Sequence, residues 1–364
     1  MARQRRCWVV NPLFESMTRE PFQDGNVATL VELTNRHGMR IVLMDIGATW
    51  LSCQLPLENE LREVLLGVDT MAAFEAQGCF FGATVGRYAN RIAKAQYQYQ
   101  GQTVHVTASQ GENCLHGGLP GWSHRRWTLT RHSENQAVFS IASADGEQGF
   151  PGHVEAFVTY ELTDNNEVRI SYHAVTDKAT PVNLTNHGYF NLMGADSGAS
   201  VLHHKLQINA DDYLPTDETA IPLGELHSVT DTGFDFRRIK PVGQDLMLDE
   251  QQVPANGYDH SYWLNDACRH GACAATLISD DELVTLHVYT DKPALQLYSG
   301  NWLQGNPGRH GSVYQNYQGL ALETQFLPDS PNHPEWQQES CMLLPEQEYA
   351  YSTVYQFQLM GEKL

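Results

Sequence analysis

The sequence lacks several features that mark common classes of protein. Its 364 residues include 23 Lys and Arg against 43 Asp and Glu, and this formal net charge of −20 repels phosphate backbones and anionic headgroups. We therefore expect neither nucleic acid nor a membrane surface as a partner. The seven cysteines are odd in number and form no C-x-x-C pair, which argues against a disulfide framework or a zinc cluster. No apolar run approaches the roughly 20 residues that span a bilayer.

Motifs for nucleotide binding and for nucleophilic catalysis are also missing. Gly82 and Gly86 are spaced G-x-x-x-G, and neither G-x-G-x-x-G nor a Walker lysine occurs. The segment His116 to Gly118 is similar to the oxyanion loop of lipases, but the nucleophile elbow G-x-S-x-G is absent. The sequence gives no support to NAD, ATP or esterase chemistry, and we expect no cofactor and no bound metal.

The N-terminus begins with basic residues but lacks the long apolar segment of an export signal. Three arginines within the first six residues are followed by a short apolar run that ends at Asn11. Unpaired cysteines are typical of a reducing compartment. We therefore expect a cytoplasmic protein.

The clearest periodicity is that of half-buried strands. Apolar residues alternate with others from Val154 to Leu162 and, after a polar turn at Thr163 to Glu167, from Val168 to Ala174. This pattern predicts a hairpin with one face toward a core. Further short strands are predicted at Val27–Leu33, Met39–Met44, Gln136–Ser143, Val284–Tyr289, Leu295–Tyr298 and Glu348–Leu359.

Helical signal is sparse, since only one short helix is indicated, at Met71 to Ala76 with Asp69 or Thr70 as its cap. Many short strands separated by Gly, Asn, Asp or Pro indicate an all-β sandwich or barrel. The composition is even along the chain, without internal repeats or a linker. We therefore predict one domain over residues 1–364.

Five polar, loop-like regions carry the candidate chemistry. They are GRYANRI (Gly86–Ile92), NCLHGG (Asn113–Gly118), TPVNLTNHGYFNL (Thr180–Leu192), GYDHSYWL (Gly257–Leu264), and the pair LQLYSGNWL (Leu295–Leu303) with LALETQFLPDSPNHPEW (Leu320–Trp336). Together they closely resemble the galactose mutarotase family of aldose 1-epimerases, and further matching segments extend the resemblance through nearly the whole chain. The resemblance implies a large antiparallel β-sandwich of the galactose mutarotase-like, or supersandwich, type with few short helices.

The resemblance also implies a set of site residues. The family's general base falls on Glu323 and its general acid on His187. Contacts to sugar hydroxyls fall on five further residues, Asn90, Arg91, His116, Asp259 and Gln296. Two departures from the family pattern, Cys114 and Gly188, leave the detailed fit of the substrate open. The implied substrate is a free aldohexose such as galactose or glucose, and the oligomeric state stays undetermined.

These residue types suit the interconversion of α and β anomers. Opening a pyranose requires removal of the proton from the C1 hydroxyl and delivery of a proton to the ring oxygen. Glu323, as a carboxylate, accepts the first proton. A protonated His187 supplies the second, because an unperturbed imidazole pKa near 6.5 allows both states. Reclosure after rotation about C1–C2 gives the other anomer without a cofactor, so we expect aldose 1-epimerase activity.

Three other functions stay open at this stage. A glycoside hydrolase needs two carboxylates, and Asp259 would have to be the second beside Glu323. A noncatalytic sugar-binding protein would have no need of the acid and base pair. An epimerase of hexose 6-phosphates would require a basic patch, which the acidic composition disfavours.

Structural roles compete with functional ones for single residues. Glu323 lies in an apolar stretch where a buried carboxylate is costly, and its alternative is an ordinary strand residue facing solvent. Trp302 and Tyr298 are interpreted as core aromatics in preference to a platform on which a sugar stacks. His203 and His204 are expected on opposite faces of a strand, where they cannot readily share a metal.

Overall fold

The computed structural model describes residues 11–360, and nearly all regular structure in that range is β-strand. All strand pairs of the three larger sheets are antiparallel. The expectation about an export signal concerns residues 1–10, which lie outside the described residues. Within the described range, no helix is both long enough and apolar enough to cross a membrane.

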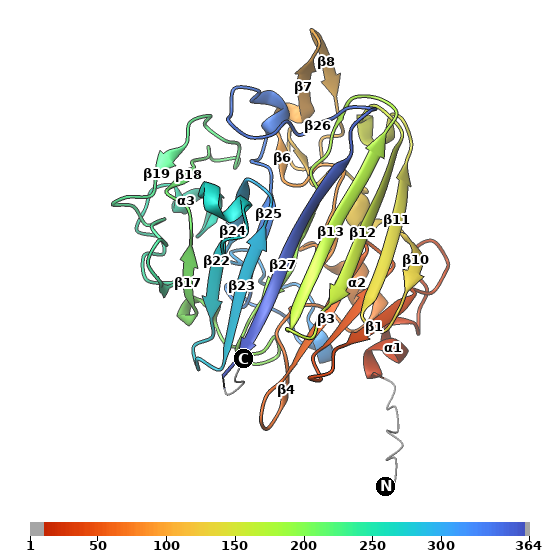
Figure 1. Ribbon diagram of the computed structural model, residues 1–364, viewed down its shortest axis with the longest axis vertical. Helices are drawn as coiled ribbons and strands as arrows, with labels where there is room; N and C mark the ends of the chain where they lie inside the picture. Colours follow the sequence, from red (N-terminus) through yellow and green to blue (C-terminus); the bar gives the residue numbers. More distant parts are fainter. Residues whose placement is uncertain (1–10, 361–364) are drawn as a thin grey trace.

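The largest sheet has nine strands, and its long central strands lie side by side in Figure 1. In spatial order the strands are β10 (Thr128–His132), β11 (Gln136–Ser143), β12 (Val154–Leu162), β13 (Glu167–Thr176), β27 (Tyr349–Leu359), β23 (Val284–Thr290), β22 (Ala275–Ile278), β17 (Lys205–Ile208) and β20 (Lys240–Pro241). The predicted hairpin is β12 with β13, where Val154 pairs with Thr176 and Leu162 with Val168. Alternate residues of both strands are buried, so the prediction from the period of two is confirmed.

A six-stranded sheet packs face to face with the nine-stranded one. In spatial order its strands are β16 (Tyr189–Phe190), β25 (Leu320–Gln325), β24 (Ala294–Tyr298), β21 (Asp259–Trp263), β18 (Asp212–Leu214) and β19 (His227–Ser228). The hydroxyl groups of Thr324 on β25 and Thr353 on β27 lie 2.5 Å apart between the two sheets. Because side chains alternate along a strand, the side chain of Glu323 points away from the nine-stranded sheet.

The remaining elements are short. The other strands are β1 (Leu30–Thr34), β2 (Arg40–Met44), β3 (Thr49–Pro56) and β4 (Leu61–Glu63) in one sheet, and the pairs β5 (Thr84–Val85) with β15 (Thr185–Asn186), β6 (Arg91–Ile92) with β9 (Cys114–Leu115), β7 (Gln96–Tyr99) with β8 (Gln102–His105), and β14 (Thr180–Pro181) with β26 (Met342–Leu343). The α-helices are α1 (Pro12–Met17), α2 (Met71–Ala76), α3 (Gln252–Ala255) and α4 (Asp266–Arg269). Each separately predicted strand coincides with an observed one, with ends shifted by at most three residues.

Local capping explains the helices. The predicted helix α2 is confirmed, and the Thr70 side chain accepts a hydrogen bond of 3.2 Å from the backbone N–H of Ala73. Helix α1 was not predicted, although its signal is present: Asn11 caps it and Pro12 occupies its first turn. The expectation that His203 and His204 share a strand is wrong. His203 ends a short 3-10 helix, and the buried His204 accepts a hydrogen bond through Nε2 from the backbone of Leu192.

One hydrophobic cluster includes residues from Val31 to Leu359 and joins the three larger sheets. Trp50 of β3 is fully buried, and its ring centre lies 5.9 Å from that of Phe190 and 5.6 Å from that of Tyr355. Each of these three aromatic rings comes from a different sheet, so their contact fixes the sheets against one another.

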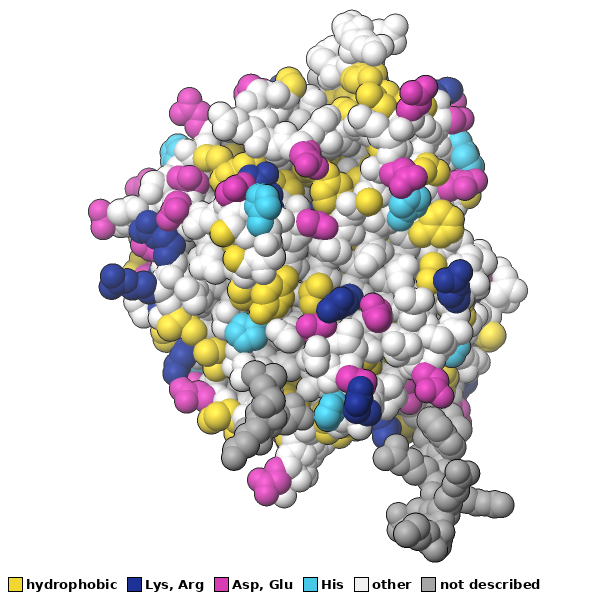
Figure 2. Space-filling view, in the orientation of Figure 1, with side chains coloured by type: hydrophobic (Ala, Val, Ile, Leu, Met, Phe, Trp, Pro, Cys, Tyr) yellow, Lys and Arg dark blue, Asp and Glu magenta, His cyan; other side chains and the backbone are white. Residues whose placement is uncertain are grey.

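Acidic side chains lie scattered over the face drawn in Figure 2, without one continuous patch.

A buried lysine joins two segments that lead to the candidate site. Lys292 is fully buried, and its Nζ donates hydrogen bonds to the backbone carbonyls of Leu184 and Thr324. The same ammonium lies 4.3 Å from the centre of the Tyr172 ring. Burial lowers the pKa of Lys292 to about 7. Lys292 thus binds both of the chain segments that carry His187 and Glu323.

Candidate active site

The floor of the site is a row of polar residues on the face of the six-stranded sheet that points away from the nine-stranded sheet. In the strand register, Ser261 of β21 lies opposite Gln296 of β24, and Gln296 lies opposite Glu323 of β25. Asp259 precedes Ser261 by two residues, so its side chain lies on the same face. Three neighbouring strands therefore bring together residues that are far apart in the sequence.

Hydrogen bonds hold this row in place. The Ser261 hydroxyl donates to the side-chain oxygen of Gln296, and the Gln296 amide nitrogen donates to Asp259 Oδ1 at 2.7 Å. Gln296 is buried, and both ends of its amide bind protein groups. Its side chain does not line the cavity above the sheet, so the structure places Gln296 behind Asp259.

The opposite wall is built by the paired strands β6 and β9. Arg91 pairs with Leu115, which brings the neighbouring Asn90 and His116 together. The backbone N–H of Asn90 donates to His116 Nδ1 at 3.2 Å, and the backbone N–H of His116 donates to the Asn90 carbonyl at 3.0 Å. Since Nδ1 is an acceptor, the neutral ring carries its hydrogen on Nε2. Burial, with the charges of His187 and Arg91, lowers the pKa of His116 well below its usual value.

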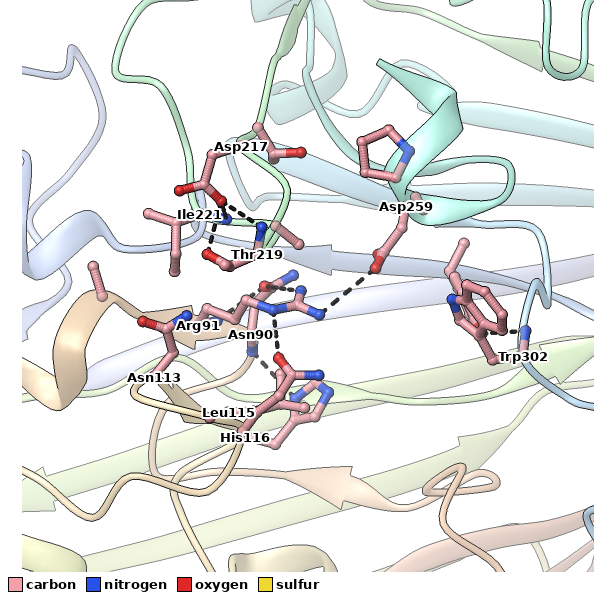
Figure 3. Close-up of a pocket in the computed structure, with 18 of the residues that line it drawn as sticks. Asn90, Arg91, Asn113, Leu115, His116, Asp217, Thr219, Ile221, Asp259 and Trp302 are labelled. Atoms are coloured by element: carbon pink, nitrogen blue, oxygen red, sulfur yellow. Dashed lines mark hydrogen bonds and ion pairs between the residues drawn. The ribbon is translucent and has the colours of Figure 1, made fainter. Parts of the chain in front are cut away.

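Arg91 connects this wall with the floor. Its Nε donates to Gln110 Oε1 at 2.8 Å, and its terminal nitrogen lies 3.7 Å from Asp259 Oδ2. Figure 3 shows the guanidinium reaching across the cavity toward Asp259. The cavity, which is open to solvent on one side, has a volume of about 920 Å³, within the usual range for a small-molecule site.

His187 and Glu323 lie together in the wall of this cavity. Their side chains are 7% and 4% exposed, and His187 Nε2 lies 3.6 Å from Glu323 Oε1. His187 follows strand β15, and its backbone N–H donates to the carbonyl of Ala83. Glu323 stands in the middle of β25, whose six residues are all buried. The alternative of an ordinary strand glutamate facing solvent is therefore wrong.

Burial shifts both pKa values toward the uncharged forms. It lowers the pKa of His187 to about 4, although the charge of Asp259 opposes this shift. It raises the pKa of Glu323 well above the usual value, and Asp259 adds to this shift while Arg91 opposes it. The unperturbed imidazole pKa near 6.5, assumed from the sequence, does not apply in the cavity. Between the two pKa values the pair holds one proton, and burial places it on the carboxyl group.

Comparisons with known proteins place this chain in a family. The family model described as aldose 1-epimerase matches residues 29–356. The aldose 1-epimerase of Escherichia coli strain K12 is 49% identical over 335 residues, which cover 92% of this chain and 96% of that protein. The galactose mutarotase of Homo sapiens is 38% identical over 321 residues, covering 88% of this chain and 91% of that protein.

The chain belongs to the aldose 1-epimerase family. Its activity is the interconversion of the α and β anomers of hexoses, as the resemblance implied. Among solved structures, an aldose epimerase homologue from C. elegans has a TM-score of 0.84 at 30% identity, covering 92% of this chain and 99% of that chain. A galactose 1-epimerase from Lactobacillus acidophilus has a TM-score of 0.80 at 29% identity, covering 93% and 96%. The predicted galactose mutarotase-like sandwich is confirmed.

Six of the seven site residues named from the sequence line the cavity of this family member: Asn90, Arg91, His116, His187, Asp259 and Glu323. The two departures from the family pattern lie elsewhere. Cys114 and Gly188 are not among the lining residues, and a Cβ at Gly188 would meet Asn186 Oδ1 at 3.1 Å. Their effect on substrate fit is therefore indirect at most.

The structure adds lining residues that the motifs did not single out, namely Phe80, Tyr189, Gln110 and the loop 216–221. Trp302 lies at the mouth of the cavity with 61% of its surface exposed, and Tyr298 lines the wall. The interpretation of Trp302 as a core aromatic is wrong, because the residue stands in the turn at Asn301–Trp302 that follows β24, and most of its surface is exposed. Within residues 11–360, no group of three or more His, Cys, Asp or Glu side chains is arranged to hold a metal ion.

Proposed function

We propose that His187 is the general acid and Glu323 the general base with which this chain interconverts the anomers of free aldohexoses. The observation that carries this proposal is their 3.6 Å approach in the wall of a cavity lined by hydrogen-bonding groups. An acid and a base must reach the C1 hydroxyl and the adjacent ring oxygen of one sugar. Two side chains this close to each other can serve two oxygens that share one carbon.

The proton count of the pair stays constant through the reaction. Glu323 takes the proton of the C1 hydroxyl while His187 gives its proton to the ring oxygen, so the C1–O5 bond breaks and a C1 carbonyl forms. The result is a protonated Glu323 and a neutral His187. This is also the distribution that burial favours. Ring closure after rotation about C1–C2 returns both protons.

The cyclic sugar requires the opposite distribution, with an imidazolium and a carboxylate. The fall of the His187 pKa from 6.5 to about 4 means that forming the imidazolium at this buried position costs about 3 kcal/mol more than in water. Hydrogen bonds from charged groups to ligand hydroxyls contribute about 1.5–3 kcal/mol each. Hydrogen bonds of this size therefore offset the cost at His187, to which deprotonation of Glu323, whose pKa burial raises, adds a further cost.

Four of the remaining residues are proposed as the hydroxyl-binding groups. Arg91 offers guanidinium donors, Asp259 a carboxylate acceptor, and His116 an Nε2–H donor, with Asn90 at their base. Gln296 is proposed to act through Asp259, whose carboxylate it holds at 2.7 Å. A site of this kind penalises a substrate that lacks a hydroxyl, because buried polar groups are then left unpaired.

Two further proposals concern the whole chain. We infer a single domain over residues 1–364, and the support is the one hydrophobic cluster that runs from Val31 to Leu359. We also infer a cytoplasmic location, supported by six free cysteines among the described residues, because cysteines stay reduced in that compartment.

The roles are tested by magnetisation-exchange NMR on aldoses at anomeric equilibrium, which measures interconversion directly and compares several sugars. The His187→Asn variant is expected to lose at least about a hundredfold in kcat, the scale of general acid catalysis. The matched control is His132→Asn, because His132 is exposed on β10 and lies outside the cavity lining. Near-native exchange in His187→Asn would refute the assigned role.

A further inference from the structure

The imidazole of His187 lies between two aromatic rings. The ring centres of Phe80 and Tyr189 are 5.8 Å and 5.0 Å from that of His187, and both rings are inclined to it by 26°. The ring of His116 meets it edge-on at 5.3 Å. Tyr189 belongs to β16, whereas Phe80 stands in a loop, so different parts of the chain stack on the same imidazole.

The ring atoms of His187 have few other constraints. Nε2 faces Glu323, and Nδ1 makes no hydrogen bond to another residue within the described chain. A functional histidine is commonly oriented by a hydrogen bond at its second ring nitrogen. No described residue other than His187 itself offers Nδ1 such a hydrogen bond. The plane of the ring is therefore set by its aromatic neighbours.

The loop that carries Phe80 is tied to the backbone of His187. Phe80 accepts a hydrogen bond from the Ala83 N–H, while the carbonyl of Ala83 accepts from the His187 N–H, and Gly82 donates to the His187 carbonyl. Gly82 has a φ of +62°, and a Cβ there would lie 1.9 Å from the Trp50 carbonyl oxygen. The turn is thus locked against both strand β3 and the candidate acid.

Phe80 itself holds an unfavourable backbone conformation. Its φ of +58° lies in the left-handed region, which costs a residue with a side chain about 1–2 kcal/mol. Such conformations persist where the surroundings hold them, and they concentrate at functional sites. The conformation directs the half-buried ring into the cavity, where it also contacts His116 at 4.7 Å between ring centres.

We propose that Phe80 is a positioning residue, which fixes the plane of the His187 imidazole so that Nε2 faces both Glu323 and the ring oxygen of the sugar. This inference rests on the proposed role of His187 as general acid. Removal of the Phe80 ring frees the imidazole to rotate and admits water to it. A small misplacement of a catalytic group reduces the rate by up to about a hundredfold.

The experiment compares Phe80→Ala and Phe80→Tyr with the wild-type protein. We expect Phe80→Ala to lose about tenfold or more in kcat, while KM changes much less. The acid limb of the kcat/KM profile should move to higher pH, because water at the imidazole of His187 relieves its desolvation and raises its pKa. Phe80→Tyr keeps the ring and should restore both quantities. Phe157→Ala is the matched control, because it removes a ring on β12 that is tilted against His173 and lies outside the cavity lining.

A purely structural role for Phe80 would lower the thermal midpoint and the active fraction without moving the pH profile. Phe80→Leu serves as a second variant if Phe80→Ala does not fold, with the same expected directions. In a His187→Asn background, Phe80→Ala should cause no further loss of kcat, because the residue it positions is gone. An equal loss in both backgrounds, or an unshifted profile with native kcat, would overturn the inference. Native turnover of His187→Asn alone would instead overturn the proposed function.

Discussion

The single proton shared by His187 and Glu323 makes the activity depend on pH in a defined way. Catalysis needs one proton on the pair. When the pH falls through the lowered pKa of His187, about 4, both groups become protonated and the base is lost. When the pH rises through the raised pKa of Glu323, the proton leaves and the acid is lost. The profile of kcat/KM should therefore be bell-shaped, with its acid limb near pH 4.

The size of the His187 pKa shift distinguishes a buried imidazole from one with an ordinary pKa. An imidazole with the ordinary pKa of 6.5 that had to be neutral in the free enzyme would lower kcat/KM about a hundredfold by pH 4.5. The buried imidazole leaves kcat/KM near its plateau at that pH. The assay is polarimetry of initial rates between about pH 3.5 and 8, with the spontaneous rate subtracted at each pH. An acid limb near pH 6.5 in the wild-type protein would refute the assignment, and His132→Asn, at an exposed residue of β10, should leave the limb unmoved.

Two further predictions concern the buried lysine and the competing hydrolase chemistry. The folded pKa of Lys292, about 7, lies below its unfolded value of 10.5, so the unfolded chain binds more protons and stability rises with pH above 7. Between pH 7 and 9 the free energy of unfolding in urea should rise by about 2 kcal/mol more for the wild-type protein than for Lys292→Met. The same rise in both proteins would contradict this prediction, and Lys205→Met, at a surface lysine, is the control. Nitrophenyl galactosides should release no nitrophenol, because Asp259 is engaged by Arg91 and Gln296; steady release would revive a hydrolase.

Much of the fold could be predicted from local patterns. The β12–β13 hairpin follows from strict alternation, and α2 from the cap at Thr70, because both signals depend only on neighbouring residues. Helix α1 was missed although Asn11 and Pro12 mark its start, since the same residues also end an apolar run. The pairing of distant strands, such as β27 between β13 and β23, depends on tertiary packing that no local pattern contains.

The candidate site could be predicted only in part, and from family motifs instead of local periodicity. The family resemblance of their motifs identified His187 and Glu323, but their 3.6 Å separation depends on the tertiary fold and their shifted pKa values arise from burial. Gln296 has the side chain of a sugar-binding group, and only the register of β21 and β24 shows that it holds Asp259. Phe80 carried no sequence signal, because its contact with His187 depends on a left-handed φ.

The central claim, that Glu323 is the base of an anomer-interconverting pair, is tested most directly by polarimetry of freshly dissolved α-D-galactose. The wild-type protein should markedly accelerate the approach to anomeric equilibrium. Glu323→Gln should lose at least about a hundredfold in kcat. Glu155→Gln, at an exposed residue of β12, should keep the wild-type rate. No acceleration by the wild-type protein, or a near-native rate in Glu323→Gln, would contradict the account.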